Sequence, residues 1–288
     1  GLLGARRATR HPGGSQALAG AALTRVRGGR LTERRFTFDA IAELYDRSRP
    51  GYPAALFDTV AREAELSDAA RILEIGCGTG QATRSLAPRC GSLVCLEPGG
   101  SMLRLARERL ASHPHVAFHN QTFEQWTLEE AAFDLVASAQ AFHWVDPAVR
   151  FAKAAAALRP GGTLAIWGHV SRASEDAVWA DVGRAYAEHA PQLAAPSSTR
   201  WYADEGPIVD LFAESARFEV ARHQAFPWSE TLTADRYADL LRTHSDHQLL
   251  PEPQRERLLS AVRRAVGAHG GHIELHDVAH LYLARVLE

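Results

Sequence analysis

The chain has 288 residues, a formal net charge of −2 and 46% hydrophobic residues, which is enough to fill the core of one large domain. A charge this close to zero gives no overall basic field, so neither nucleic acid nor an anionic membrane is indicated as a partner. No apolar run in the sequence reaches membrane-spanning length. These features favour a globular protein without a nucleic-acid or membrane partner.

The cysteine and lysine contents suggest a setting for the protein. Cys77, Cys90 and Cys95 lack zinc-type spacing, and an odd number of cysteines makes a poor disulfide framework. A reducing, cytoplasmic compartment is therefore expected. Lys153 is the only lysine among 32 basic residues, a bias typical of GC-rich coding, from which we expect a bacterial origin.

The N-terminal part of the chain divides into two segments. Residues 1–35 are rich in Gly, Ala and Arg and contain one acidic residue, Glu33, as a targeting peptide does. We expect a flexible extension and assign it no function. The following segment, 36–64, shows helical spacing of apolar residues on both sides of a Pro-Gly-Tyr-Pro turn at 50–53.

A short apolar run at 72–75 predicts a buried strand, and glycines at 76, 78 and 80 then lead into a helical pattern. A strand that turns through glycines into a helix presents free backbone N–H groups and a positive helix end to a ligand. The nicotinamide-binding pattern would need a small residue at position 81, where this chain has Gln81. The next predicted strand, 93–96, ends in Glu97, at about the distance where a carboxylate accepts ribose hydroxyls.

Further strands are predicted at 115–119, 133–138 and 163–170, with one helix at 102–110 before the first of them and another at 149–158 before the last. Ser101 and Asp146 are expected to cap these two helices. Alternating strands and helices with short turns indicate a parallel, doubly wound sheet, whose ligands bind at the carboxyl ends of the strands. After residue 172 the pattern is mainly helical, with strands expected at 218–225 and 273–286.

The E-x-G-x-G-x-G spacing from Glu74 to Gly80 resembles the first motif of class I S-adenosylmethionine (SAM)-dependent methyltransferases. The leader before it and the final strands resemble the methyltransferase type 11 subgroup, which includes trans-aconitate methyltransferase relatives. The resemblance covers residues 36–288. It implies an α/β fold with a Rossmann-like doubly wound sheet, mostly parallel with an antiparallel final strand, and helical insertions that form a cap. The implied division is a SAM-binding core at 36–171 and a cap with the last two strands at 172–288.

The resemblance also implies which residues contact SAM or its product, S-adenosyl-L-homocysteine. Tyr45 could instead be a core residue, Arg49 a solvated charge and Met102 a core filler. The candidate cofactor contacts are Tyr45, Arg49, Glu74, Gly76, Cys77, Gly78, Gly80, Glu97, Pro98, Met102, Phe123, Glu124 and Gln140.

Methyl transfer from a sulfonium depends mainly on positioning, and a general base matters only if the acceptor must lose a proton. His143, just beyond the fourth strand, could be that base, line the pocket or pack in the core. Trp144 could form a wall of the acceptor pocket or belong to the core. The expected acceptor contacts are His143, Trp144, Trp201, Tyr202, Trp228, His244 and His247.

Several acceptor classes lack their motifs here. The segment 138–141 carries neither the N/D-P-P-Y motif of nucleic-acid amino-methyltransferases nor the two glutamates of protein arginine methyltransferases. Gln140 and His169 stand where metal-dependent catechol enzymes have acidic ligands. The sequence therefore predicts a metal-free methyltransferase for small molecules, with oxygen the favoured acceptor and nitrogen or carbon open. His272, His276 and His280 are interpreted as one partly solvated strand face, not as metal ligands.

Two other functions stay open on the sequence alone. One is a non-catalytic protein that binds SAM or a nucleotide, because a fold does not by itself confer activity. The other is an NAD-dependent dehydrogenase, against which Gln81 and the lack of a hydride-transfer motif argue. The sequence gives no indication of the oligomeric state.

Overall fold

The computed structural model describes residues 38–172, 174–193 and 201–287, and the predicted extension at 1–35 lies outside them. The strands are β1 (Arg71–Ile75), β2 (Ser92–Leu96), β3 (Val116–His119), β4 (Phe133–Ala139), β5 (Leu158–Ser171), β6 (Arg222–Thr233) and β7 (His272–Arg285). The α-helices are α2 (Ala42–Ser48), α3 (Ala54–Glu63), α4 (Thr83–Leu86), α5 (Gly100–Arg109), α6 (Arg150–Ala157), α7 (Ala177–His189), α8 (Ile208–Ser215), α9 (Ala234–Arg242), α10 (Ser245–Gln248) and α11 (Glu252–Ala268). Short 3₁₀ turns are η1 (Asp39–Ile41), η2 (Ala87–Arg89), η3 (Phe142–Trp144) and η4 (Pro191–Leu193).

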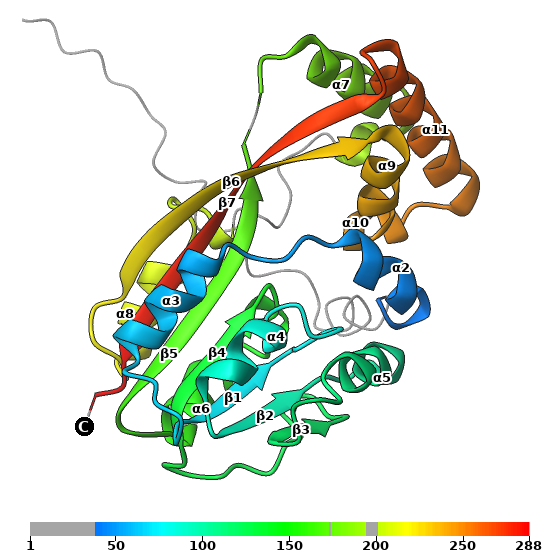
Figure 1. The fold of residues 1–288 in the computed structure, drawn as a ribbon. Coiled ribbons are helices and arrows are strands. Elements are labelled where there is room, and N and C mark those ends of the chain that lie inside the picture. Colours follow the sequence, from blue (N-terminus) through cyan, green and yellow to red (C-terminus); the bar gives the residue numbers. More distant parts are fainter. Residues whose placement is uncertain (1–37, 173, 194–200, 288) are drawn as a thin grey trace, which may run out of the picture.

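The described strands form one sheet in the order β3-β2-β1-β4-β5-β7-β6 (Figure 1). The pairs among β1 to β5 are parallel, whereas β7 runs antiparallel to both β5 and β6. The order reverses between β1 and β4, which is the switch point where ligands bind in open α/β sheets. The prediction of a mostly parallel, Rossmann-like sheet with an antiparallel final strand is confirmed.

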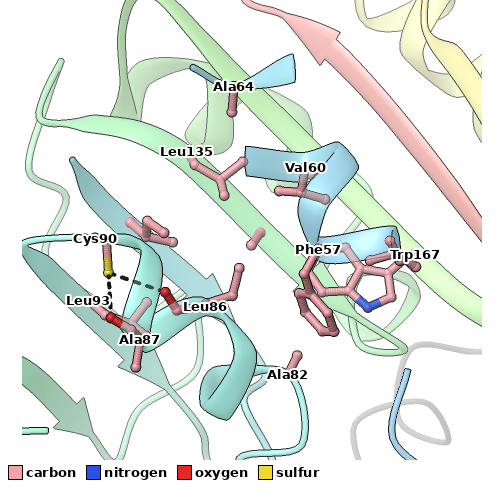
Figure 2. Packing of buried hydrophobic residues seen from close by; sticks show 14 of the residues in the cluster. Phe57, Val60, Ala64, Ala82, Leu86, Ala87, Cys90, Leu93, Leu135 and Trp167 are labelled. Carbon is pink, nitrogen blue, oxygen red and sulfur yellow. Dashed lines mark hydrogen bonds between the residues drawn. The ribbon is translucent and has the colours of Figure 1, made fainter. Parts of the chain in front are cut away.

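Both faces of the central strands are buried, as their continuous apolar runs require. On one face, Phe57 and Val60 of α3 and Leu86 of α4 pack against Leu135 and Trp167 of the sheet (Figure 2). The Cys90 thiol lies in this layer, 3.6 Å from the carbonyl oxygen of Leu86. The opposite face is covered mainly by aromatic and aliphatic side chains of α6 and α8.

β5, β6 and β7 extend beyond the other strands, and α7, α9 and α11 gather at their far ends (Figure 1). We call α7, α9, α10 and α11 the cap. It has a core of its own, in which Val182, Leu240 and Leu259 pack with Ile273 and Leu275 of β7. The predicted helical cap is thus present. The division predicted between residues 171 and 172 stays a prediction, because β6 and β7 belong to both the sheet and the cap.

Three predicted boundaries differ from the structure. Helix α5 begins at Gly100, so Ser101 is not its N-cap, and α6 begins only at Arg150. The carboxylate of Asp146 accepts the backbone N–H of Ala148 at 2.9 Å in the turn before α6 and caps no helix. Strand β6 continues to Thr233, so Trp228 lies within it, because the long antiparallel partner β7 supplies hydrogen bonds along this whole length.

None of the helices that the structure describes is long and apolar enough to cross a membrane.

Candidate active site

The loop after β1 brings the backbone unusually close to the end of β4. Gly76 and Gly78 have φ of +73° and +58°, a region that side chains rarely occupy. A Cβ on Gly76 would lie 2.3 Å from the Cβ of Ala141, so even alanine does not fit there. Only glycine satisfies both the conformation and the contact.

The carboxylate of Glu97, at the end of β2, joins this loop to the next turn. Its Oε2 accepts the backbone N–H of Gly78 at 3.0 Å, and its Oε1 accepts that of Gly99 at 2.9 Å. The Asn120 amide donates to the carbonyl oxygens of Glu97 and Pro98, both at 2.9 Å. A carboxylate suits this position because it accepts several hydrogen bonds at once.

Two cavities lie beside the loop. The first, of about 670 Å³, is lined by Phe38, Tyr45, Ile75, Gly76, Gly78, Leu96, Glu97, Pro98, Met102, Gln121, Thr122, Phe123, Glu124, Ala139, Gln140, Ala141, Trp144 and Val145. The second, of about 440 Å³, is lined by Tyr45, Arg49, Pro50, Tyr52, Glu74, Gly76, Cys77, Gly78, Gln81, Ala82, Ala139, Gln140 and His169. Tyr45, Gly76, Gly78, Ala139 and Gln140 border both.

Most of the residues predicted to contact a cofactor line these cavities. The first cavity contains Tyr45, Gly76, Gly78, Glu97, Pro98, Met102, Phe123, Glu124 and Gln140 of that set, and the second adds Arg49, Glu74 and Cys77. Gly80 lines neither. Its φ is +91°, and a Cβ there would lie 3.0 Å from the Leu110 side chain, so this glycine allows close packing of the loop on the α5 end.

The leader segment covers the first cavity through a contact that the sequence analysis missed. The Asp39 carboxylate accepts the backbone N–H groups of Ser101 at 2.6 Å and Met102 at 3.3 Å, at the start of α5. This contact fixes Phe38 and Tyr45, whose rings meet edge to face at 5.6 Å. An acidic residue 62 positions before a helix gives no local capping signal, so only the tertiary structure reveals it.

Arg49 ties the leader to the cap. Its Nη2 donates to the carbonyl oxygen of Thr243, just after α9, at 2.9 Å, and its guanidinium lies over the Tyr45 ring at 5.1 Å. Gln140, which follows β4, has a φ of +54°. Such a conformation is uncommon for a residue other than glycine and is concentrated at functional sites.

Glu74 is fully buried in the wall of the second cavity. Burial raises the pKa of its carboxyl from 4.5 to about 7, and the nearby Thr83 hydroxyl and Cys95 thiol offset part of that shift. The Cys95 sulfur lies 3.7 Å from Oε2. Glu74 therefore changes its charge near neutral pH.

His143 lies in η3 and lines neither cavity. Its Nδ1 is 2.9 Å from the Tyr202 hydroxyl, and its ring contacts Trp144 and Trp201. Burial and the Arg150 guanidinium lower the pKa of His143 to about 3. The imidazole is therefore neutral at physiological pH and a weak base.

The seven predicted acceptor contacts form separate groups. His143 contacts Trp144, Trp201 and Tyr202, His244 contacts His247, and Trp228 lies against His169. Only Trp144 lines one of the two cavities. Tyr202 is 1% exposed and packs under Gly168, on the face of the sheet opposite α3. A side chain buried in this way does not agree with a place at the entrance of an acceptor pocket. His247 is also buried, with its Nε2 2.8 Å from the Tyr186 hydroxyl.

The residues around Arg49 are better placed to contact an acceptor than the seven predicted residues are. His169, at the carboxyl end of β5, lines the second cavity and stacks on Tyr52 at 4.3 Å, and its ring meets Trp228 at 5.4 Å. Burial, and then the charge of Arg49, lower the pKa of both His169 and His244. Its position at a strand end is the signal that could have identified His169 from the sequence.

Residues 72–162 match a family model described as a methyltransferase domain. An uncharacterized methyltransferase of Mycobacterium tuberculosis is 28% identical over 235 residues, which are 81% of this chain and 86% of the relative. An uncharacterized methyltransferase-like protein of Schizosaccharomyces pombe is 29% identical, over 84% of this chain and 86% of the relative. The trans-aconitate 2-methyltransferase of Variovorax paradoxus is 36% identical, over 42% of this chain and 44% of the relative.

This chain is a SAM-dependent methyltransferase. Solved structures share its fold. A protein of Anaeromyxobacter dehalogenans, provisionally assigned as a type II methyltransferase, has a TM-score of 0.57 at 24% identity, over 82% of this chain and 97% of the other. The phosphoethanolamine N-methyltransferase 2 of Haemonchus contortus, in complex with S-adenosylhomocysteine, has a TM-score of 0.53 at 17% identity, over 92% of this chain and 61% of the other.

The predicted class and cofactor are confirmed, and the dehydrogenase alternative is set aside. The methyltransferase also passes a direct test of fit to SAM. The glycine loop leaves a backbone cradle that a Cβ would obstruct at Gly76, and the Glu97 carboxylate reaches this loop from the end of β2. The adjoining cavity is lined by apolar side chains, by the glycine loop and by carboxylates, which suits a nucleoside.

The Asp39 contact predicts a measurable loss of SAM affinity. Asp39→Ala removes the acceptor at the start of α5, which costs about 1 kcal/mol in comparable caps, and it loosens the segment that carries Phe38 and Tyr45. We expect SAM to bind roughly fivefold more weakly by calorimetric titration. Glu43→Ala, on the same segment but exposed and paired with Arg104, is the control. Equal affinities in the two variants would contradict the assignment.

Glu74 predicts a pH dependence of stability. Because its folded-state pKa lies above 4.5, its contribution is fully present below pH 4.5 and is lost as the pH rises through about 7. Between about pH 5 and pH 8, the unfolding free energy of the SAM-free protein should fall by about 2–3 kcal/mol relative to that of Glu74→Gln. Denaturant unfolding at both pH values measures this, with the surface variant Glu129→Gln as the control. If the unfolding free energies of the wild type and Glu74→Gln changed equally with pH, the raised pKa of Glu74 would be refuted.

Proposed function

We propose that this methyltransferase transfers the SAM methyl group to an oxygen atom of a small organic acid, without a metal ion and mainly by positioning. The observation that carries the proposal is that the two cavities share five bordering residues, Tyr45, Gly76, Gly78, Ala139 and Gln140. One extended cofactor can therefore occupy both cavities, with its reactive centre near the residues they share.

The two cavities differ in chemistry, and each suits a different part of SAM. Met102 and Phe123 give the first cavity apolar walls, and Glu97 and Glu124 add carboxylates, which suits an adenosine group. Arg49 and Glu74 give the second cavity opposite charges, which suits the amino-acid end of SAM. Bound SAM supplies an electrophilic methyl group on a sulfonium, and the protein residues hold the reacting groups in line and exclude water.

We place the acceptor beside His169. Neither ring nitrogen of His169 makes a hydrogen bond of normal geometry among the described residues, although the Gly51 backbone is near. The Nε of Arg49 and the indole Nε1 of Trp228 are also buried without a hydrogen-bond partner among the described residues. Buried polar atoms usually have partners, so a ligand with oxygen acceptors is favoured here. Trp228, His244 and Trp144 keep their proposed acceptor contacts, whereas Tyr202, Trp201 and His247 become supporting residues.

The choice of a carboxylic acid has two supports. Arg49 gives the acceptor side a positive charge, and the relative from Variovorax is named for methylation of trans-aconitate. A carboxylate is already ionised at neutral pH, since its ordinary pKa is about 4, so its methylation needs no general base. This agrees with a His143 that is neutral and bonded to Tyr202.

We also propose a reducing compartment such as the cytoplasm, in a bacterial cell. Cys77, Cys90 and Cys95 are buried and unpaired, which suits such a setting, and the sparse lysine usage favours the bacterial origin.

The proposal is tested by incubation of the enzyme with methyl-labelled SAM and parallel sets of di- and tricarboxylic acids, phenols and amines. We expect label in the acids as a base-labile ester, with no dependence on added Mg²⁺. Label confined to phenols or amines would contradict the acceptor class. SAM binding without transfer to any acceptor would favour a non-catalytic SAM-binding protein instead.

His143→Asn distinguishes support from general-base catalysis. Loss of a general base typically costs 10²–10⁴-fold in rate, whereas we expect less than a roughly tenfold loss of kcat/KM. The pH profile of kcat/KM should keep its shape. Tyr202→Phe, which removes only the hydroxyl that His143 contacts, should behave similarly. A loss above a hundredfold for His143→Asn alone would restore His143 as the base.

A further inference from the structure

Asp204, His223 and His280 come together on the sheet, away from both cavities. His223 lies on β6 and His280 on β7, and Asp204 lies in the segment before α8. The sequence pattern predicted that His280 lies on a partly solvated strand face together with His272 and His276. The structure corrects this, because the His280 side chain is only 6% exposed and has partners from two other segments.

The three side chains offer ligand atoms at short range. The Nδ1 of His280 lies 2.9 Å from the Nε2 of His223 and 2.6 Å from the Oδ1 of Asp204, and the Nε2 of His223 lies 3.4 Å from the same oxygen. The imidazole planes are within 9° of parallel. Two imidazoles and one carboxylate form a donor set that suits Zn²⁺ and related divalent ions.

Hydrogen atoms alone satisfy this cluster poorly. The two ring nitrogens face each other, so one hydrogen at most can lie between them. The Asp204 oxygen is closest to the same Nδ1, yet it lies well off the line along which that nitrogen meets His223. A cation provides a common partner for the three lone-pair donors.

The spacing leaves a place for such an ion. A circle through the three atoms has a radius of about 1.8 Å, so a point about 2.0–2.1 Å from each, the usual Zn–N distance, lies just off their plane. Tilting of the two rings lets their lone pairs converge there. Asp204 and His223 are 66% and 28% exposed, so the open side admits water as a further ligand.

An ion bound at this position would also hold a neighbouring segment of the chain against the sheet. Asp204 follows Tyr202 by two residues, and the Tyr282 hydroxyl donates to the carbonyl oxygen of Ala203 at 2.8 Å. Tyr202 in turn holds His143. A bond from Asp204 to an ion on β6 and β7 would fix this segment to the sheet on the side opposite α3.

We propose that Asp204, His223 and His280 form a binding site for one divalent transition-metal ion, Zn²⁺ above all, which clamps residues 201–204 onto β6 and β7. The second group with ligand spacing, His244, Asp246 and His247, is less suited. There the Nε2 of His247 is already bonded to the Tyr186 hydroxyl. The site is structural and leaves the proposed metal-independent chemistry unchanged.

The test is calorimetric titration of ZnCl₂ into untagged full-length protein that has been freed of metal with a chelator. We expect one ion per chain with at least micromolar affinity, and a rise in Tm on binding. Asp204→Asn and His223→Asn change exposed side chains and should each weaken binding at least tenfold, with unchanged circular dichroism. His276→Asn, on the same face of β7 but paired with Glu274, should bind as the wild type does.

Substitution of Co²⁺ for Zn²⁺ gives a second readout, because its visible absorption reports histidine and carboxylate ligation. The bands should appear in the wild type and in His276→Asn, and they should be lost in His223→Asn. Failure of the wild type to bind Zn²⁺ below millimolar concentration would overturn the proposal and leave a hydrogen-bonded histidine pair. Equal binding by the wild type, Asp204→Asn and His223→Asn would overturn it as well.

Discussion

The Glu97 carboxylate is the contact on which the cofactor site depends. It accepts backbone N–H groups from Gly78 and Gly99, so one side chain fixes both the loop after β1 and the turn before α5. The carboxylate is largely buried, and charge-assisted hydrogen bonds are stronger than neutral ones in such a place. These two hydrogen bonds therefore determine the shape of the first cavity, because residues of both segments line it.

Two further contacts hold the leader in place, one against the start of α5 and one against the cap. Asp39 binds the leader to the start of α5, and Arg49 binds the end of α2 to the carbonyl oxygen of Thr243 after α9. Phe38, Tyr45 and Arg49 thus reach the cavities from a segment that precedes the sheet in sequence. The second cavity is bordered by this leader, by the glycine loop and by the end of β5. Its environment therefore depends on three segments that are distant along the chain.

The sequence predicted the parts of the molecule that local patterns control. Apolar runs and glycines identified β1, its loop and the strand ends where the ligand binds, and the spacing from Glu74 to Gly80 indicated the class of enzyme. Glu97 was found because its distance from the glycine loop is set by the length of one β-α-β unit. The packing of Gly80 against Leu110 was not predicted, because Leu110 follows α5, which is distant from the glycine loop along the chain.

The acceptor side was harder to predict, because it depends on tertiary contacts without a local signature. Trp228 was expected after a strand and lies within one, since the length of β6 is set by pairing with β7. His143 was a candidate base on the sequence, but burial and then the Arg150 guanidinium lower its pKa. His169 and the pairing of His280 with His223 require the sheet order β5-β7-β6, which no single segment encodes.

The role of Glu97 is tested most directly by calorimetric titration of the wild type and Glu97→Ala with SAM, S-adenosylhomocysteine and NAD. We expect micromolar-range binding of the first two ligands to the wild type and no binding of NAD. Loss of the Glu97 hydrogen bonds should weaken SAM binding roughly 100-fold, while the protein stays folded by circular dichroism. Glu97→Ala that binds SAM as tightly as the wild type would contradict the central place given to this carboxylate.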